Sequence, residues 1–367
     1  MSRPKRKATS FDIAYRAGVS QPTVSRALRG SPLVSEETRQ RILEIARELN
    51  YKVDKNASSL RSQQSGTLAL LLFEDPTPDD SNINPFFLSM LGSITRACAR
   101  RNYDLLVSFQ QLSTDWHADY EDSKRADGLI LLGYGDYMDY RSTLEKLIEQ
   151  GTHFVRWGAV LEDQLGVSIG CDNVQGGRDC TAHLIRQGRR HIAFLGGADQ
   201  TCPEFFDRYR GYTDALTAAG LRVDARLQVD AITSEQQGYD AVCTLLERDV
   251  RFDAIFAASD LIAIGAMRAL GEKGFKVPDD IAVAGFDDIP LATFTNPPLT
   301  SVLQDTKRAG ELLVDTLLKQ IHNEPVENIK FPAQLVVRRS CGSKPADHKT
   351  AGKPATESPP GSGTVAR

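Results

Sequence analysis

Seven short apolar runs, separated by longer amphipathic stretches, constrain the fold of most of this chain. The runs are TLALLLF, YDLLVSF, GLILL, HFVRW, HIAFL, AIFAA and IAVAGF, and the first begins at residue 67. Apolar runs of this length predict parallel strands covered on both faces, and the stretches between them predict crossover helices. About ten strand and helix units are too many for one sheet. Residues 66–342 are therefore expected to form two similar doubly wound α/β lobes, with a ligand cleft between them.

The first 65 residues differ from this body in charge. Residues 1–65 carry 13 Lys and Arg against 6 Asp and Glu, a net charge of +7. The remaining residues carry 31 against 42, a net charge of −11, although the whole chain has only −4. A basic head on an acidic body indicates a polyanionic partner for the head alone. A solvated basic tail is the alternative that charge by itself leaves open.

Local signals predict two short helices near the start of the head. Thr9 with Asp12 forms a capping box for the first helix, and Gly18 ends it. Ser20 then caps a second helix, and Pro22 lies in its first turn, where an N–H would have no intrahelical acceptor.

A third helix is expected to begin at Ser35 and to pack behind the first two. Two short helices joined by a tight glycine-containing turn are typical of a helix-turn-helix, whose second helix enters the major groove of DNA. Arg26 on that helix can pair with a guanine and Gln21 with an adenine edge, while the hydroxyls of Thr23 and Ser25 suit bases or phosphates. A packing module with solvated polar residues is the alternative. The expected core of the head is Ile13, Ala14, Val24, Ala27, Leu28, Ile42, Ile45, Ala46 and Leu49.

A polar segment follows the head, with Ala57 and Leu60 on one face of a possible hinge helix at about residues 53–62. Such a helix is too short to be stable alone in water, so it would fold only on a partner. Leu60 from each of two subunits could wedge into a minor-groove base step and kink the duplex. A flexible linker is the alternative.

These motifs resemble those of the lactose/galactose repressor family of bacterial transcription regulators. The matching stretches are DIA from Asp12, AGVS from Ala17, TVSR from Thr23 and VS from Val34, and the resemblance continues to about residue 341. The family usually has Pro and Asn after the tyrosine that precedes the hinge, an Arg after the hinge alanine, and Asn at the end of the recognition helix. This chain has Val53, Asp54 and Ser58 in the hinge and Arg29 at the helix end.

The resemblance implies a periplasmic-binding-protein-like body, with three crossovers between lobes near residues 160–166, 288–298 and 323–330. No leucine heptad is present near the end of the sequence, so a homodimer on a palindromic double-stranded operator is expected. The residues expected to contact DNA are Thr9, Ser20, Gln21, Pro22, Thr23, Ser25, Arg26, Arg29, Ala57 and Leu60.

Polar and aromatic side chains also gather where the predicted strands of the body end. Arg208 presents a planar fork of donors, and Asp260 and Asp287 present acceptor pairs that suit vicinal hydroxyls. An aromatic face beside them would complete a sugar site. The alternatives are that Asp260 only caps its helix, that Asp287 only braces a turn, and that the aromatic residues belong to the core. The aromatic candidates are Phe86, Trp157 and Phe286.

The resembled family adds roles to these positions. The Arg of its RxxG motif and the Asp of its GFDD motif contact effector hydroxyls, and these are Arg208, with Gly211, and Asp287 here. Gln304 matches a further position that faces the cleft, and Ser259 stands where Asn is common in the family.

Other classes of function find little support. GxSxG, GxxxxGK[ST], HExxH and GxGxxG are absent, and the six His and six Cys residues are dispersed, so no catalytic, metal or cofactor site is expected. No apolar run reaches the roughly 18 residues of a membrane span, and no signal peptide is apparent, so the protein is expected in the cytoplasm. Residues 343–367 are expected to be disordered.

The sequence therefore predicts a repressor of a carbohydrate-utilisation operon that a mono- or disaccharide releases from DNA. In this scheme the ligand favours one arrangement of the lobes, and that arrangement decides whether the hinges become ordered on DNA. Three alternatives stay open: a regulator that a purine or nucleoside co-represses, a sugar-binding receptor without DNA function, and a sugar-processing enzyme.

Overall fold

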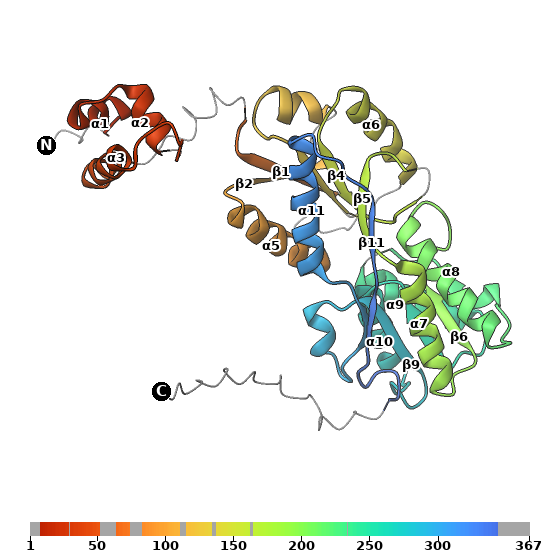
Figure 1. The fold of residues 1–367 in the computed structure, drawn as a ribbon. Helices are drawn as coiled ribbons and strands as arrows, with labels where there is room; N and C mark the ends of the chain where they lie inside the picture. Colours follow the sequence, from red (N-terminus) through yellow and green to blue (C-terminus); the bar gives the residue numbers. More distant parts are fainter. Residues whose placement is uncertain are drawn as a thin grey trace, which may run out of the picture. The chain divides into compact units, whose positions relative to one another are not determined.

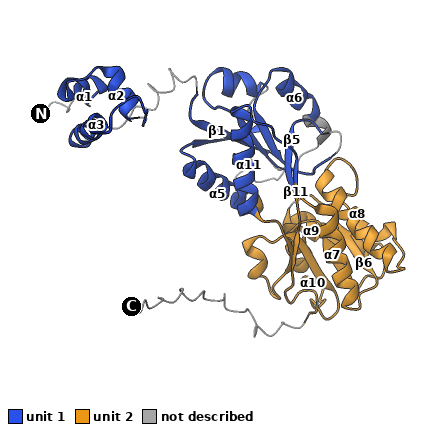
Figure 2. Ribbon diagram, in the orientation of Figure 1, with its two compact units in different colours: residues 1–83, 87–170, 306–329 blue, residues 84–86, 171–305, 330–367 orange. Residues whose placement is uncertain are grey.

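The computed structural model describes residues 8–28, 30–51, 64–73, 83–110, 115–133, 137–161, 164–232 and 234–343. The chain divides into two compact units, of which the first contains residues 1–83, 87–170 and 306–329, and the second residues 84–86, 171–305 and 330–367 (Figure 2). Arg29, the predicted hinge with Ala57 and Leu60, and the tail beyond residue 343 lie outside the described residues.

The three helices predicted for the head are present as α1 (Ser10–Ala17), α2 (Gln21–Leu28) and α3 (Glu36–Glu48) (Figure 1). The backbone N–H of Thr9 donates to the Asp12 carboxylate at 2.7 Å, and that of Asp12 donates to the Thr9 hydroxyl at 3.4 Å, which confirms the capping box. Gly18 ends α1 with φ 64°. The buried core of the head is Ile13, Ala14, Ala17, Val24, Ala27, Val34, Ile42 and Ala46, with Leu28, Ile45 and Leu49 partly buried against it.

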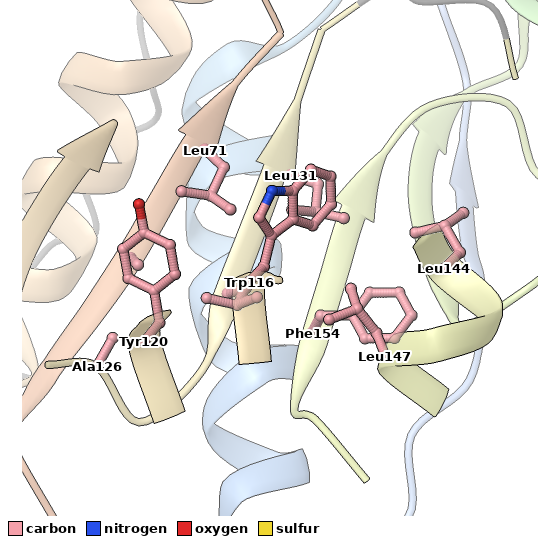
Figure 3. Close-up of a cluster of buried hydrophobic side chains, with 10 residues drawn as sticks. Leu71, Trp116, Tyr120, Ala126, Leu131, Leu144, Leu147 and Phe154 are labelled. Atoms are coloured by element: carbon pink, nitrogen blue, oxygen red, sulfur yellow. The ribbon is translucent and has the colours of Figure 1, made fainter. Parts of the chain in front are cut away.

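The first α/β sheet has the strand order β11-β5-β4-β3-β1-β2. Its strands are β1 (Thr67–Leu72), β2 (Asp104–Phe109), β3 (Leu129–Leu132), β4 (Phe154–Trp157), β5 (Val167–Cys171) and β11 (Ile329–Phe331). The helices of this part are α5 (Pro85–Arg100), the π-helix η2 (His117–Asp122), α6 (Tyr137–Glu149) and α11 (Thr306–Ile321). One core cluster packs Trp116 and Tyr120 against Leu71 of β1 and two leucines of β3, with Phe154 and two leucines of α6 beside them (Figure 3).

The second sheet has the order β12-β10-β9-β8-β6-β7. Its strands are β6 (Ile192–Leu195), β7 (Gln228–Val229), β8 (Ala254–Ala257), β9 (Ala282–Asp287), β10 (Thr300–Leu303) and β12 (Gln334–Val336). Its helices are α7 (Asn173–Arg186), α8 (Pro203–Ala218), α9 (Glu235–Glu247) and α10 (Asp260–Glu272), with the short 3-10 helices η3 (Ala225–Leu227) and η4 (Pro290–Thr293).

The two sheets share one topology. In each, the first five strands in chain order pair in the spatial order 2-1-3-4-5, and a sixth strand from the end of the chain joins the fifth. The pairings β1 with β2 and β3, and β6 with β7 and β8, are parallel, as in doubly wound folds. The prediction of two similar doubly wound lobes is therefore confirmed.

Two of the three predicted crossovers were placed too early in the chain. Apart from residues 84–86, which group with the second unit, the chain changes unit between residues 170 and 171, 305 and 306, and 329 and 330. The third lies in the predicted range, but the first two come after 160–166 and 288–298. The physical reason is that β5 pairs with β4 in the first sheet and β10 pairs with β9 in the second, so each sheet gains one more strand before the chain leaves it.

Candidate functional site

The guanidinium group of Arg208, on α8, is the centre of a polar cluster in the second unit. This side chain is fully buried; its Nε donates to Oδ1 of Asn173 at 2.9 Å, and its Nη1 donates to the carbonyl oxygen of Ala258. Nη1 lies 3.6 Å from Oδ1 of Asp287, so the buried cation has a buried counterion. The guanidinium carbon is 3.9 Å from the centre of the Phe286 ring, a cation–π contact that orients the plane of the group.

Asp287 and Gln304 bring two further polar groups to Arg208 from the carboxyl ends of neighbouring strands. Asp287 is the last residue of β9, Gln304 follows β10, and Nε2 of Gln304 donates to Oδ1 of Asp287 at 2.7 Å. Asp287 has a φ of 109°, a backbone conformation that residues with side chains rarely adopt. Such a conformation costs about 1–3 kcal/mol and is concentrated at functional sites. The carboxylate is thus held in place by its backbone as well as by its partners.

Asp260 lies beside this group, but its carboxylate is bound by the two segments that follow β9. Its carboxylate accepts hydrogen bonds from the Ser301 hydroxyl and, at 2.8 Å, from the backbone N–H of Ile289. The N-cap of α10 is Ser259 rather than Asp260. Burial, together with the nearby negative charge of Asp287, raises the pKa of Asp260 well above its usual value. Asp260 therefore ties the start of α10 to the segment that follows β9.

The three predicted aromatic contacts have different surroundings. The ring of Phe286 lies against the Arg208 guanidinium, so it supports the arginine directly. Phe86 lies near the start of α5, and Trp157 is the last residue of β4; both are buried. Contact of these rings with an effector stays a prediction.

Sequence reading missed two residues that hold Arg208. Asn173, the first residue of α7, accepts from Nε of Arg208 and donates to the carbonyl oxygen of Cys171 at 3.2 Å. The ring of Phe205 is 5.1 Å from the guanidinium carbon. A polar residue just after a strand end was the available signal for Asn173, but the strand before it, VSIGC, was not recognised.

The site combines the planar guanidinium group of Arg208, the carboxylate of Asp287 and the amide of Gln304, and all three are buried. A hydroxyl can donate to a carboxylate and accept from a guanidinium at the same time, and an amide can do either. The cluster can therefore bind vicinal hydroxyl groups. Among the described residues, no group of His, Cys, Asp or Glu side chains is placed to hold a metal ion, and none of the helices is long and apolar enough to cross a membrane.

The outer face of α2 carries the candidate DNA contacts. Val24 and Ala27 point into the core of the head, which leaves the opposite face to polar residues. On that face Arg26 is exposed, Ser25 is half-buried, and Pro22 is exposed in the first turn. Within the described residues, no hydrogen bond or ion pair engages the Arg26 side chain, so it is available to a partner.

The other candidate DNA contacts of the head also stabilise it. Ser20 and Thr23 share a hydrogen bond of 2.8 Å between their hydroxyls, and the Ser20 hydroxyl accepts from the backbone N–H of Thr23, which confirms the predicted cap. Gln21 donates to the Ser10 hydroxyl at 3.2 Å, and Thr9 is held in its capping box.

Comparisons with known proteins agree with this anatomy. Residues 11–54 match the profile "Bacterial regulatory proteins, lacI family", and residues 181–341 match "Periplasmic binding protein-like domain". The HTH-type transcriptional regulator CelR of Thermobifida fusca is 31% identical over 344 residues, which cover 92% of this chain and 99% of that protein. The HTH-type transcriptional repressor PurR of Histophilus somni is 30% identical over 339 residues, covering 91% and 98%. The chain belongs to the LacI family.

Solved structures of the LacI family share the fold. A complex of the regulator CelR with cellobiose is 31% identical, has a TM-score of 0.67, and is matched over 91% of this chain and 99% of its own. A lac repressor dimer bound to operator is 26% identical, has a TM-score of 0.76, and is matched over 92% and 99%. These findings confirm the predicted family and fold class.

In this LacI-family chain, Gly211 of the RxxG motif has a clear structural role. A Cβ on Gly211 would lie 2.6 Å from the backbone nitrogen of Arg178, and closer still to the carbonyl oxygen of Val174. A Cβ on Gly177 would lie 3.0 Å from the carbonyl carbon of Arg208. The two glycines thus let the backbones of α7 and α8 touch, and this contact sets the position of the arginine.

Gly211→Ala should lower the free energy of unfolding by about 1–3 kcal/mol, because the methyl group would push against backbone atoms that cannot move aside. Chemical denaturation measures this effect. Gly271→Ala is the matched control, since a Cβ there meets nothing within 4 Å and alanine favours a helix. Equal stability of the Gly211 and Gly271 variants would contradict the proposed role.

Proposed function

We propose that this LacI-family protein is a homodimeric repressor of a carbohydrate-utilisation operon, released from a palindromic operator by a mono- or disaccharide. The observation that supports a sugar effector is the buried Arg208–Asp287 pair, with Gln304 hydrogen-bonded to the same carboxylate. A sugar hydroxyl can engage both charged groups at once. A solved relative, CelR, was captured with cellobiose.

The residues of the site have distinct proposed roles. Arg208, Asp287 and Gln304 contact the effector, while Asp260 and Ser259 hold the backbone that carries Asp287. Phe86 and Trp157 are proposed to cover an apolar face of the sugar, as aromatic side chains do in ligand pockets.

The head is proposed to place α2 in the major groove, with Gln21, Ser25 and Arg26 facing base edges. The family consists of transcription regulators, and we propose that this member has no catalytic activity and acts in the cytoplasm, where bacterial operators lie.

The solved lac repressor on its operator is a dimer. Two exposed apolar side chains at η4, Leu291 at 49% and Phe294 at 85%, are consistent with a protein interface on the second unit.

A purine or nucleoside co-repressor is the second candidate, because the PurR repressors are relatives of similar identity. A purine base could stack on an aromatic face and pair its ring nitrogens with the same polar groups. It would strengthen operator binding, whereas the proposed sugar weakens it.

The test is a thermal-shift screen of monosaccharides, disaccharides, purine bases and nucleosides on the full-length protein. An operator is selected from random-sequence DNA, and its affinity is measured with and without each hit. We expect a sugar hit that weakens operator binding about tenfold, a coupling of about 1.4 kcal/mol. A purine that strengthens binding would establish the second candidate, and a screen without hits in either class would overturn both.

A further inference from the structure

A groove of about 330 Å³ opens at the amino ends of the strands of the second sheet, opposite to the Arg208 cluster at their carboxyl ends. It lies where β6 begins, at Ile192, whereas Asp287 lies where β9 ends. A strand of four residues spans about 13 Å, so the groove and Asp287 are separated by the length of the strands. The groove is lined by Arg190, His191, Ile192, Leu216, Leu221, Arg222, Asp224, Arg226, Leu227, Val250 and Arg251.

The rim of the groove is strongly basic. Four arginines line it against a single carboxylate, that of Asp224. Within the described part of the chain, the guanidinium groups of Arg190, Arg222 and Arg251 have no hydrogen-bond or ion-pair partner, and all three residues are exposed. This concentration is unexpected, because the chain outside the head is acidic overall.

Two acids near the groove, Asp224 and Asp253, are already engaged. Arg226 forms an ion pair with Asp224 at 2.6 Å. Hydrogen bonds from Arg226, with its positive charge and that of Arg222, lower the pKa of Asp224 to about 2. The carboxylate of Asp253 accepts the backbone N–H groups of Arg190 and His191 at 3.0–3.1 Å. In the described structure neither carboxylate forms an ion pair with Arg190, Arg222 or Arg251.

The floor of the groove is apolar. Ile192, Leu216 and Leu227 are buried beneath it, and Leu221 and Val250 are half-buried at its sides. A ligand that matches both parts has a multiply charged anionic group and a less polar body. Guanidinium groups bind phosphate with paired hydrogen bonds. Several arginines together can balance the two negative charges of a phosphate group, whereas a carboxylate has only one.

We propose that this arginine groove is a second ligand site, which binds a phosphorylated small molecule with its phosphate on the arginines and its body on the apolar floor. The volume of about 330 Å³ is at the lower end of the range for small-molecule pockets. The site is independent of the effector cluster, since it lies at the other edge of the sheet and uses none of its residues.

Isothermal titration of the full-length protein tests the proposal with three probes: inorganic phosphate, adenosine 5′-monophosphate and glucose 6-phosphate. Adenosine and glucose serve as unphosphorylated counterparts. The variant is Arg222→Gln/Arg251→Gln, which removes two exposed charges without breaking a hydrogen bond or ion pair of the described structure. The matched control is Lys273→Gln/Arg339→Gln, which removes two exposed charges of the same unit outside the groove.

We expect at least one phosphorylated probe to bind saturably, and the groove variant to weaken that binding about tenfold or more while the control retains it. No saturable binding of any of the three probes would overturn the proposal. So would equal losses in the groove and control variants, which indicate non-specific attraction, or equal binding of the phosphorylated and unphosphorylated partners. If the groove variant instead lost only affinity for random-sequence DNA, the groove would be a DNA contact and the proposal wrong.

Discussion

Arg208→Ala should lower the free energy of unfolding by about 3–5 kcal/mol and abolish the response of operator binding to the effector. The cost arises because the buried carboxylate of Asp287 would lose the cation 3.6 Å away, and because the Phe286 ring would lose its contact with the guanidinium group. Urea denaturation measures the stability, and operator titration with and without the effector measures the response.

A variant that keeps the charge separates the two effects. Arg208→Lys retains a cation near Asp287 but loses the planar fork that reaches Asn173 and Ala258. We therefore expect it to fold with a smaller loss of stability and still bind the effector poorly. Arg178→Lys, at an exposed pair with Asp214, is the control and should change neither quantity. An Arg208→Ala protein as stable and responsive as the wild type would remove Arg208 from the site.

Local signals predicted the head closely because its helices begin and end on short-range hydrogen bonds. The Thr9–Asp12 capping box, the left-handed Gly18 and the Ser20 cap each depend on residues within a few positions of one another. The strands predicted from apolar runs were also confirmed, since the buried strands of parallel sheets consist almost entirely of apolar residues. β2 is the exception, because it lies at the edge of its sheet and is only partly buried.

The features that sequence reading placed wrongly depend on weaker strands. In β5 and β10, Ser168 and Ser301 interrupt the apolar pattern, so neither strand was recognised and the first two crossovers were set too early. The buried Ser301 hydroxyl donates to Asp260 and accepts from the backbone N–H of Asp288, and both contacts join distant parts of the chain. No local pattern encodes such a pair.

The sequence predicted the charged residues of the candidate effector site, but not the residue that holds Arg208 in position. Arg208 and Asp287 stood out by motif, and the structure joins them in one ion pair. Asn173 was missed because the strand before it was not recognised, and because its contact with Arg208 forms only once α7 and α8 pack together through Gly177 and Gly211. Tertiary packing, rather than residue type, makes Asn173 part of the site.

Arg26→Glu should weaken specific operator binding by about 100-fold or more at physiological salt. Loss of a bidentate arginine–guanine contact alone costs about 1–3 kcal/mol, and a carboxylate beside phosphates and acceptor base edges adds repulsion. Folding should be unaffected, because Arg26 is exposed and its neighbours Val24 and Ala27 hold α2 in the core. Fluorescence anisotropy with the selected operator and with random DNA measures the effect.

Two companion variants identify what Arg26 does on DNA. Arg47→Glu, at an exposed position of α3, changes net charge by the same amount and should lower affinity only a few-fold through the general field. Arg26→Lys keeps the charge but lacks the planar fork, so it should retain binding to random DNA while losing discrimination at one base pair of each half-site. If Arg26→Glu and Arg47→Glu weakened operator binding equally, α2 would not be the helix that reads the bases, since only a helix in the major groove makes the identity of the residue matter more than its charge.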